Sequence, residues 1–459
     1  MIHRYQKKGL NFVLDVNSGA VHLLDDISYA VSGLIDENMT EKCPESVVEA
    51  LPQYAADDVR EAYGELYELK KAGQLFAEDD YIDVSRYIPV GAPVKALCLH
   101  VAHDCNLRCK YCFASTGDFG QGRKIMPPEV AKKAIDFVIA RSGKRRNIEV
   151  DFFGGEPLMA WDTVTQTVDY ARSIEEQHGK KFRFTITTNG LLLDEDKRRY
   201  INENMDNCVL SLDGRREVND EFRKTVAGTG SYDTIVPKFK ALVDERDPNL
   251  DYYARGTFTS HNLDFAEDVL SIADAGFDRL SVEPVTADPG CGYDLTEDDL
   301  PKIEAEYDRL TDIMLERKKE GKPFTFFHFM VDLDQGPCVV KRLRGCGAGY
   351  EYVAVTPDGD IYPCHQFVGK DEFKQGSVLD QSFNMDIAQK FAGMNIYSRP
   401  KCQKCWAKFY CSGGCSAANY NMNHDMNDSY DLGCEMERKR LECAIYLKAM
   451  DKICAEEAK

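Results

Sequence analysis

A repeated alternation of short apolar strands and amphipathic helices, between residue 96 and about residue 290, constrains the fold of this 459-residue chain most strongly. The strand-like segments are ALCLHV (96–101), NIEVDFF (147–153), KFRFTITT (181–188), NCVLSL (207–212), DYYARGTFT (251–259) and DRLSVEP (278–284). Helical periodicity separates them, for example in PEVAKKAIDFVIARSG (128–143) and FAEDVLSIADAG (265–276). Repeated units of this length predict an α/β fold with a parallel sheet, here a partial (β/α)6 TIM-type barrel. Such barrels place their chemistry at the C-terminal ends of the strands.

Residues 1–88 have a different pattern and are predicted to form a small separate module. Two apolar-alternating runs, RYQKKGLNFVLDV (4–16) and AVHLLD (20–25), meet at Asn17-Ser18-Gly19, which is typical of a hairpin turn. Helical periodicity follows in ISYAVSGLI (27–35), SVVEAL (46–51) and DDVREAYGELYELKKAG (57–73), the last with Gly73 as its C-cap. With a short QLFAE strand (74–78), these elements resemble a winged helix-turn-helix, and Pro89 to Pro93 form a stiff linker.

Charge and hydropathy exclude several functions. The formal net charge of −20 argues against nucleic-acid binding, which needs a basic face. No apolar run follows the basic N-terminus, and no stretch approaches the roughly 20 apolar residues of a membrane span. We therefore expect a soluble cytoplasmic protein with no nucleic-acid or membrane partner.

Seventeen cysteines, many in tight clusters, are a poor disulfide framework and indicate metal ligands in a reducing compartment. Cys105, Cys109 and Cys112 directly follow the first predicted strand of the barrel, with the spacing C-x3-C-x2-C. Three thiolates on one loop can hold three irons of a [4Fe–4S] cluster and leave the fourth iron open. A zinc site or buried thiols are the alternatives, although zinc sites usually close with four ligands.

This spacing, with Tyr111 before the last cysteine, resembles the signature of radical S-adenosylmethionine (SAM) enzymes. Further matches to that family follow in order at successive strand ends. The resemblance implies that the cysteines are catalytic and that the cofactor contacts are Tyr111, Gly154, Gly155, Glu156, Asn189, Ser211 and Arg223. Two glycines let the backbone approach the ligand closely, a carboxylate suits an ammonium, and Arg223 suits the cofactor carboxylate. Thr188 or Asn189 can instead cap the following helix.

The tail, residues 321–459, carries a second cysteine pattern: Cys346, Cys364, then CQKCWAKFYCSGGC (402–415) and Cys434. It resembles the seven-cysteine signature of SPASM domains, which bind two auxiliary [4Fe–4S] clusters. The resemblance assigns Cys402, Cys405, Cys411 and Cys434 to the second cluster and Cys346, Cys364 and Cys415 to the first. The last iron of the first cluster takes Cys338 or remains open for a substrate thiolate. A pair of zinc ribbons is the alternative.

The chain is thus divided into residues 1–88, a barrel of residues 89–320 and the SPASM tail. Poor in long apolar periods, the tail is predicted to lack a large core and to be held together by metal. Cys98 and Cys208 lie within apolar strands and are expected in the core.

Together these features resemble radical SAM peptide maturases, most closely the maturase of six-cysteine peptides, which forms thioethers. That resemblance implies three [4Fe–4S] clusters, SAM, and an electron donor such as ferredoxin or flavodoxin. It also implies a cysteine-rich precursor peptide whose leader adds a strand to the edge at residues 21–24. The implied reaction abstracts hydrogen from an acceptor carbon, to which a peptide cysteine then bonds. Alternatives are a sulfatase-type maturase, peptide epimerisation, carbon–carbon bond formation, or a redox-sensing DNA-binding regulator.

Overall fold

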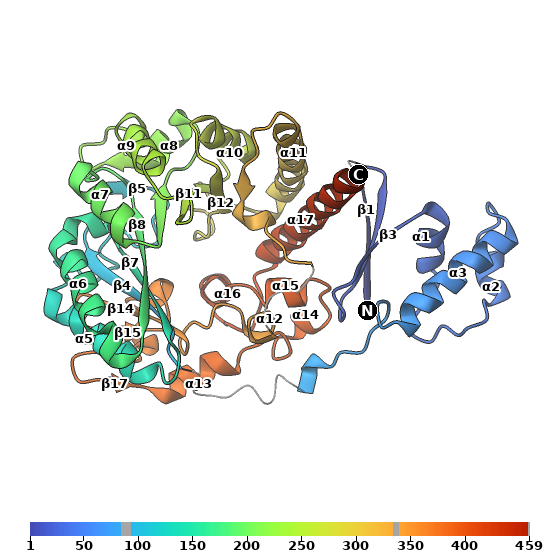
Figure 1. The fold of residues 1–459 in the computed structure, drawn as a ribbon, viewed down its shortest axis with the longest axis horizontal. Coiled ribbons are helices and arrows are strands. Elements are labelled where there is room, and N and C mark those ends of the chain that lie inside the picture. The colour runs from blue at the N-terminus through green and yellow to red at the C-terminus, as the bar shows by residue number, and fades with distance from the viewer. Residues whose placement is uncertain (84–92, 334–338, 458–459) are drawn as a thin grey trace.

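The computed structural model describes residues 1–83, 93–333 and 339–457. All six predicted barrel strands are present and pair in parallel, in chain order, within one curved sheet (Figure 1). They are β4 (Ala96–His103), β7 (Asn147–Gly154), β8 (Lys181–Thr188), β9 (Asn207–Ser211), β11 (Asp251–Phe258) and β12 (Arg279–Pro284). The predicted α/β fold with a parallel sheet is therefore confirmed.

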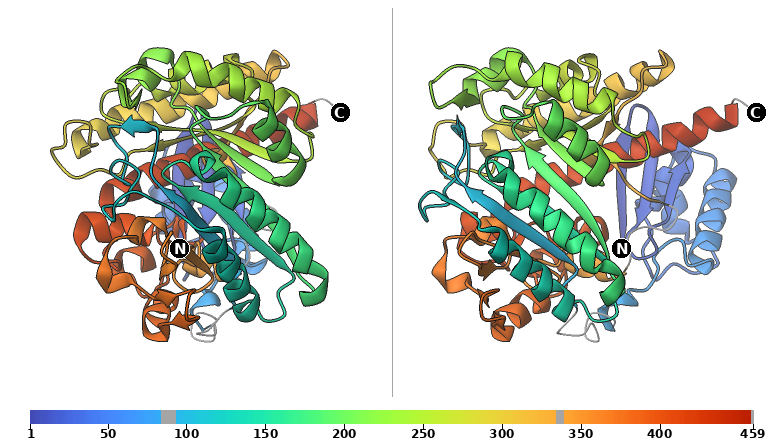
Figure 2. Two further views of the ribbon diagram at one scale, coloured as in Figure 1. Left: turned by 90° about the vertical axis from the view of Figure 1, so that its left-hand side faces the viewer. Right: turned by 60° about the vertical axis from the view of Figure 1, so that its left-hand side comes forward.

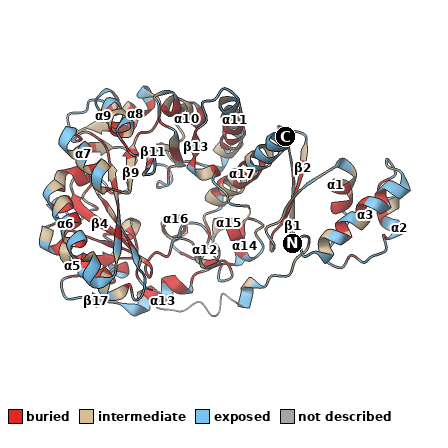
Figure 3. Ribbon diagram, viewed as in Figure 1, coloured by how far each residue is buried: buried red, intermediate tan, exposed pale blue. Residues whose placement is uncertain are grey.

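Helices follow these strands and cover the outer face of the sheet (Figures 1 and 2). They are α5 (Pro128–Arg141), α6 (Trp161–His178), α7 (Glu195–Asn204), α8 (Arg216–Phe222), α9 (Tyr232–Asp244), α10 (Phe265–Asp274) and α11 (Leu300–Lys319). Their apolar faces bury the core residues Phe152, Phe184, Phe239 and Phe258 against the strands, as the burial pattern shows (Figure 3). Cys208 belongs to this core, as expected. No helix in the described parts of the chain is long and apolar enough to cross a membrane.

The tail extends the barrel sheet at both of its edges. The strand β13 (Thr325–Phe326) pairs in parallel with β12, and β14 (Tyr352–Val355) pairs in parallel with β4. Beyond β14 the sheet continues with antiparallel strands, and the described part of the tail also contains five short α-helices and the long helix α17, which packs against α11. These elements are β15 (Asp360–Tyr362), β16 (Gly376–Ser377), β17 (Ser382–Phe383), α12 (Val339–Arg344), α13 (Met385–Gly393), α14 (Pro400–Gln403), α15 (Lys408–Cys411), α16 (Ser416–Asn423) and α17 (Asp431–Glu457).

The tail also contains a core of its own, so the prediction that it lacks one is wrong. Phe367, Phe373 and Phe391 are nearly inaccessible and pack with one another at ring-centroid distances of 4.5–6.0 Å. Cys98, expected in the core, is buried with them. Two of these rings, Phe367 and Phe373, lie in one-turn helices, and Phe391 lies in α13. Their spacing along the chain is therefore irregular, and a search for helical or strand periods misses them.

The N-terminal module has three strands followed by three helices. They are β1 (Ile2–Lys7), β2 (Leu10–Asp15), β3 (Val21–Leu24), α1 (Asp26–Ser32), α2 (Glu45–Glu49) and α3 (Ala56–Lys71). The hairpin turn at residues 17–19 and the three helices are confirmed, and Gly73 ends α3 with φ +70°. Two strand predictions are wrong. The first run divides into two strands at Lys8 and Gly9, which both have positive φ. Residues 74–78 form no strand, because Phe76 has φ +52°.

The module is attached to the rest of the chain through β1, which lies beside α17 (Figure 1). His3 stacks on Trp406 at a centroid distance of 3.7 Å, and its Nε2 lies 2.9 Å from Glu442 Oε1. Lys7 donates to the thiol of Cys443 (3.2 Å) and pairs with Asp308 of α11. Buried polar contacts thus fix β1 to the body of the protein. Most of the predicted linker at residues 89–93 lies outside the described residues.

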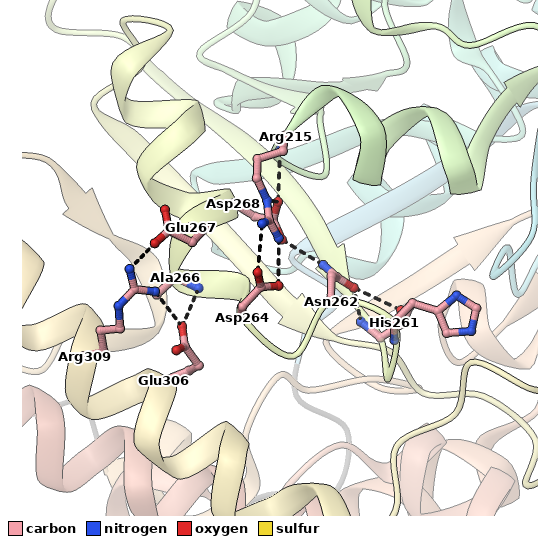
Figure 4. Close-up of polar contacts among 10 residues, drawn as sticks. Arg215, His261, Asn262, Asp264, Ala266, Glu267, Asp268, Glu306 and Arg309 are labelled. Atoms are coloured by element: carbon pink, nitrogen blue, oxygen red, sulfur yellow. Dashed lines mark hydrogen bonds and ion pairs between the residues drawn. The ribbon is translucent and has the colours of Figure 1, made fainter.

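A buried carboxylate organises the C-terminal end of β9. Arg215 donates from its backbone N and from Nε to Asp268 Oδ1, at 3.0 and 2.8 Å, and its two terminal nitrogens donate to Asp264 (Figure 4). Asn262 donates to the other oxygen of Asp268 (3.0 Å). A Cβ atom at Gly214 would collide with Asp268. The network therefore determines the path of the chain directly after β9.

We expect Arg215→Ala to destabilise the barrel by about 2 kcal/mol, because a buried carboxylate loses its cation while Arg215 itself is partly exposed. Thermal unfolding followed by circular dichroism should show a lower Tm. Arg199→Ala is the matched control, since Arg199 forms an exposed pair with Asp196 at 2.6 Å. Equal Tm values for the two variants would contradict this role of Arg215.

Candidate active site

The three cysteines of the C-x3-C-x2-C loop lie together at the C-terminal end of β4. Cys105, Cys109 and Cys112 line one cavity of about 250 Å³. A two-stranded antiparallel sheet outside the barrel supports this loop. In it, β5 (Leu107–Cys109) pairs with β10 (Arg223–Thr225), and Arg223 lies directly opposite Cys109. The pairing brings Arg223 to the cysteine loop through two short strands that were not predicted.

The thiols of this loop are half-buried, and their surroundings raise the pKa of all three. Burial raises the pKa of Cys105 to about 12 and that of Cys109 to about 11. All cysteines in the described ranges are free. Within these ranges, no three His, Cys, Asp or Glu side chains converge closely enough to hold a single metal ion. A [4Fe–4S] cluster does not need such convergence, because each thiolate binds a different iron.

Gly154 and Gly155 have a different role from the one expected. A Cβ atom at Gly154 would collide with the carbonyl oxygen of Ala102, and one at Gly155 with that of Asp104. Gly154 also has φ +122°, which favours glycine. The close approach permitted by the two glycines is therefore to the backbone that leads into the cysteine loop. Both residues nevertheless line the cavity.

Glu156 connects two strand ends. Its side chain is 1% exposed, and its Oε1 accepts hydrogen bonds from Thr188 Oγ1 (2.7 Å) and Leu158 N (3.0 Å). Its Oε2 accepts from Asn189 N (2.8 Å). Burial raises the pKa of Glu156, and these hydrogen bonds act in the opposite direction. The carboxylate thus joins the end of β7 to the end of β8.

Asn189 and Ser211 both line the cavity. Asn189 Nδ2 donates to Asn106 Oδ1 of the cysteine loop (2.7 Å), and its Oδ1 accepts from Leu191 N (3.0 Å). Neither Thr188 nor Asn189 caps the next helix, because Asp194 caps α7. The alternative that they are only helix caps is therefore wrong.

Tyr111 and Arg223 meet at a buried aspartate that the sequence analysis did not select. Tyr111 Oη donates to Asp213, at 2.6 and 2.8 Å from its two oxygens, and accepts from Arg223 Nη1 (2.8 Å). Arg223 Nη1 lies 3.7 Å from Asp213 Oδ1, and Thr257 N donates to the same oxygen (3.2 Å). Asp213 directly follows the end of β9, and this strand-end position was the available signal.

The far side of the cavity is formed by Glu283, which ends the sixth predicted strand, and by residues that no sequence motif indicated. Arg255 of β11 forms a bidentate pair with Glu283 of β12, with N–O distances of 3.2 and 2.5 Å. His365 and Gln366, from the tail, complete the lining. The tail therefore reaches the barrel cavity, and burial lowers the pKa of His365 to about 4.

The four cysteines assigned to the second auxiliary cluster lie together. Cys402, Cys405, Cys411 and Cys434 all line a second cavity, of about 320 Å³. They come from α14, the segment after it, α15 and α17, so elements far apart in the sequence supply the four thiols. Burial raises the pKa of Cys411 to about 12, and the other three thiols act in the same direction.

The cysteines assigned to the first auxiliary cluster are also neighbours. Burial raises the pKa of Cys364, and the charges of Cys415 and Cys346 act in the same direction. Cys338, the alternative fourth ligand, lies outside the described residues.

Comparisons with known families agree with these two parts of the chain. Residues 99–251 match the radical SAM superfamily, and residues 346–406 match the SPASM iron–sulfur cluster-binding domain. The first range contains the cysteine loop and β4 to β9. The second contains four of the seven tail cysteines that were assigned as ligands.

Several characterised proteins are similar over most of the chain. A cysteine-type anaerobic sulfatase-maturating enzyme from Clostridium novyi is 25% identical over 72% of this chain and 90% of its own length. The mycofactocin maturase MftC of Mycobacterium ulcerans is 29% identical over 72% of this chain and 84% of its own length.

Solved structures share the fold. Native anSMEcpe with bound AdoMet superimposes with a TM-score of 0.64 and 20% identity, over 79% of this chain and all of its own. SuiB of Streptococcus suis bound to its precursor peptide SuiA superimposes with a TM-score of 0.54 and 17% identity, over 94% of this chain and 98% of its own. One part of the chain therefore matches the radical SAM superfamily and another the SPASM domain, and over most of its length the chain is similar to sulfatase and peptide maturases.

Proposed function

We propose that this enzyme installs cysteine thioether cross-links in a ribosomally made, cysteine-rich precursor peptide, using SAM and three [4Fe–4S] clusters. One observation carries the proposal: a cavity at the strand ends is lined by three thiols, by a buried arginine and by residues of a cysteine-rich tail. The three thiols would hold the cluster that supplies radical chemistry. The cysteine-rich tail would supply further cluster ligands next to the same cavity.

The residues of the cavity suit the proposed cofactors. Cys105, Cys109 and Cys112 would hold the radical cluster, and the fourth iron would bind SAM. Arg223 is 8% exposed, and its Nε is buried without a hydrogen-bond partner among the described residues. A carboxylate such as that of SAM would satisfy this nitrogen. Cluster and SAM together supply hydrogen-atom abstraction from an unactivated carbon.

The protein would orient these groups and exclude water. Tyr111 and Asp213 hold the guanidinium of Arg223, and Glu156 fixes the strand ends on which Asn189 and Ser211 would contact the cofactor. His365, with Gln366, covers the cavity from the tail side. Seven tail cysteines would hold the auxiliary clusters in the two sets described above.

A peptide substrate is supported by the relatives and by the N-terminal module. SuiB has been solved with its precursor peptide. Its match extends over 94% of this chain, so the matched part must include residues of the N-terminal module. Within the module, β3 pairs only with β2 among the described strands and is an edge strand. An extended leader would add to this edge by backbone hydrogen bonds.

A sulfatase-type maturase is the second candidate, favoured by the similarity to the enzyme of Clostridium novyi. That enzyme aligns with 72% of this chain, whereas SuiB aligns with 94%. The substrate therefore distinguishes the two functions: a short peptide with a leader in one case and a sulfatase in the other. Electrons for either reaction would come from a small donor such as ferredoxin or flavodoxin.

The central test is an anaerobic incubation of the iron-loaded protein with SAM, dithionite and a synthetic cysteine-rich peptide carrying a leader. We expect each cross-link to remove two hydrogens from the peptide and to protect one cysteine from alkylation, as read by mass spectrometry. Cys105→Ala should abolish the change, whereas Cys454→Ala, an exposed thiol in α17, should not. Formation of 5′-deoxyadenosine with an unchanged peptide would reject the thioether product and retain the radical chemistry.

Tyr111→Phe should weaken SAM binding roughly tenfold, because Arg223 and Asp213 lose a shared hydroxyl worth about 1 to 2 kcal/mol. Equilibrium binding of SAM to the iron-loaded protein measures this effect. Tyr170→Phe is the control, since Tyr170 donates to Asp136 on the surface (2.7 Å). An unchanged Kd with unchanged iron content would show that the hydroxyl does not position Arg223.

Leu23→Asp should weaken binding of the leader, because it places a charge on the exposed strand β3, where Leu23 is 43% exposed. Fluorescence anisotropy of a labelled leader peptide reports the affinity. Leu34→Asp changes an equally exposed leucine of the module, at 45%, beyond the end of α1. Equal weakening by both substitutions would place the leader on another surface.

A further inference from the structure

A buried arginine lies between the two cysteine sets of the tail. Arg399 is 3% exposed and directly precedes α14. In that helix, the backbone N of Cys402 donates to the carbonyl oxygen of Arg399 (3.0 Å). Its guanidinium donates from Nη1 to Gly413 O (2.6 Å) and from Nη2 to Ser416 Oγ (3.0 Å). Arg399 thus connects the helix that begins the second set to the loop that joins the two sets.

The shape of that loop depends on the guanidinium. Ser412, Gly413 and Gly414 have φ values of +60°, +90° and +72°, so three consecutive residues are left-handed. A Cβ atom at Gly413 would collide with Arg399. On the other side, a Cβ atom at Gly345, the neighbour of Cys346, would lie 3.7 Å from Ser412. The loop is therefore packed between Arg399 and the segment that carries the first cysteine of the tail.

Arg399 has no anionic partner among the residues that the structure describes. None of the described carboxylates forms an ion pair with it, and its Nε is buried without a hydrogen-bond partner among the described residues. Burial lowers the pKa of Arg399, and two thiols from each set act to raise it: Cys402, Cys411, Cys415 and Cys346. A buried cation is costly unless an anion compensates it. Thiolate-ligated iron–sulfur clusters are such anions.

We propose that Arg399 is a positioning residue shared by both auxiliary clusters, with its cation offsetting the negative charge of the two sites and its hydrogen bonds fixing the loop between them. This inference rests on the proposed function, which places clusters at these cysteines. A cation beside a cluster favours the more negative, reduced form, most strongly where water is excluded. Arg399 therefore raises the reduction potentials of both auxiliary clusters.

The test is an anaerobic redox titration followed by electron paramagnetic resonance. Replacing Cys105, Cys109 and Cys112 with alanine leaves only the auxiliary clusters in the full-length chain. In that background, Arg399→Gln should shift both midpoint potentials to more negative values. Arg438→Gln is the matched control, because Arg438 Nη1 lies 3.9 Å from Cys405 Sγ and faces the second set. It should shift one potential only.

The variant Arg399→Lys separates charge from shape: it keeps the cation and should retain potentials close to those of the parent. A shift of neither potential, or of only one, in Arg399→Gln would overturn the inference. If Arg399→Gln loses its iron, retention of both clusters by Arg399→Lys supports the shared cation, and loss in both variants overturns it. A parent that holds fewer than roughly eight irons per chain would instead reject the two-cluster assignment of the proposed function.

Discussion

Two backbone hydrogen bonds join the cysteine loop to the neighbouring strand, and the geometry of the cavity depends on them. Gly155 N donates to Ala102 O (2.7 Å), and Glu156 N donates to Asp104 O (2.9 Å). No side chain fits between these backbones, so the glycines of this turn cannot be replaced without moving the loop. Gly117 acts in the same way from within the loop, because a Cβ atom there would collide with Cys105.

From this contact the polar groups of the site extend around the sheet, from one strand end to the next. Glu156 joins β7 to β8, and Asp213 holds Tyr111 of the cysteine loop at the end of β9. Each carboxylate is buried and accepts several hydrogen bonds, so the strand ends are held in a fixed arrangement without any ligand. A cofactor would thus meet a site that is already formed, which reduces the cost of ordering it.

The tail is part of the barrel as well as a cluster-binding unit. Because β14 pairs with β4, the segment that follows it carries Cys364 and His365 to the cavity at the end of the same sheet. The boundary predicted near residue 320 marks a change in sequence pattern, whereas the sheet continues on both sides of it. This continuity brings His365, the neighbour of Cys364, to the cavity that Cys105, Cys109 and Cys112 line.

The sequence by itself determined the six parallel strands, the hairpin at residues 17–19 and the cysteine loop that follows the first strand of the barrel. These features are local: strand periods, turn residues and ligand spacings are set by neighbours in the chain. The extra break at Lys8 and Gly9 and the loss of the strand at residues 74–78 depended on positive φ angles that the apolar pattern does not reveal. Only the tertiary structure decided that Asp213 holds Tyr111 and Arg223, that β14 extends the barrel, and that Arg399 lies between two cysteine sets. Those contacts join residues far apart in the sequence, and they depend on how strands pair and loops pack, which no local pattern specifies.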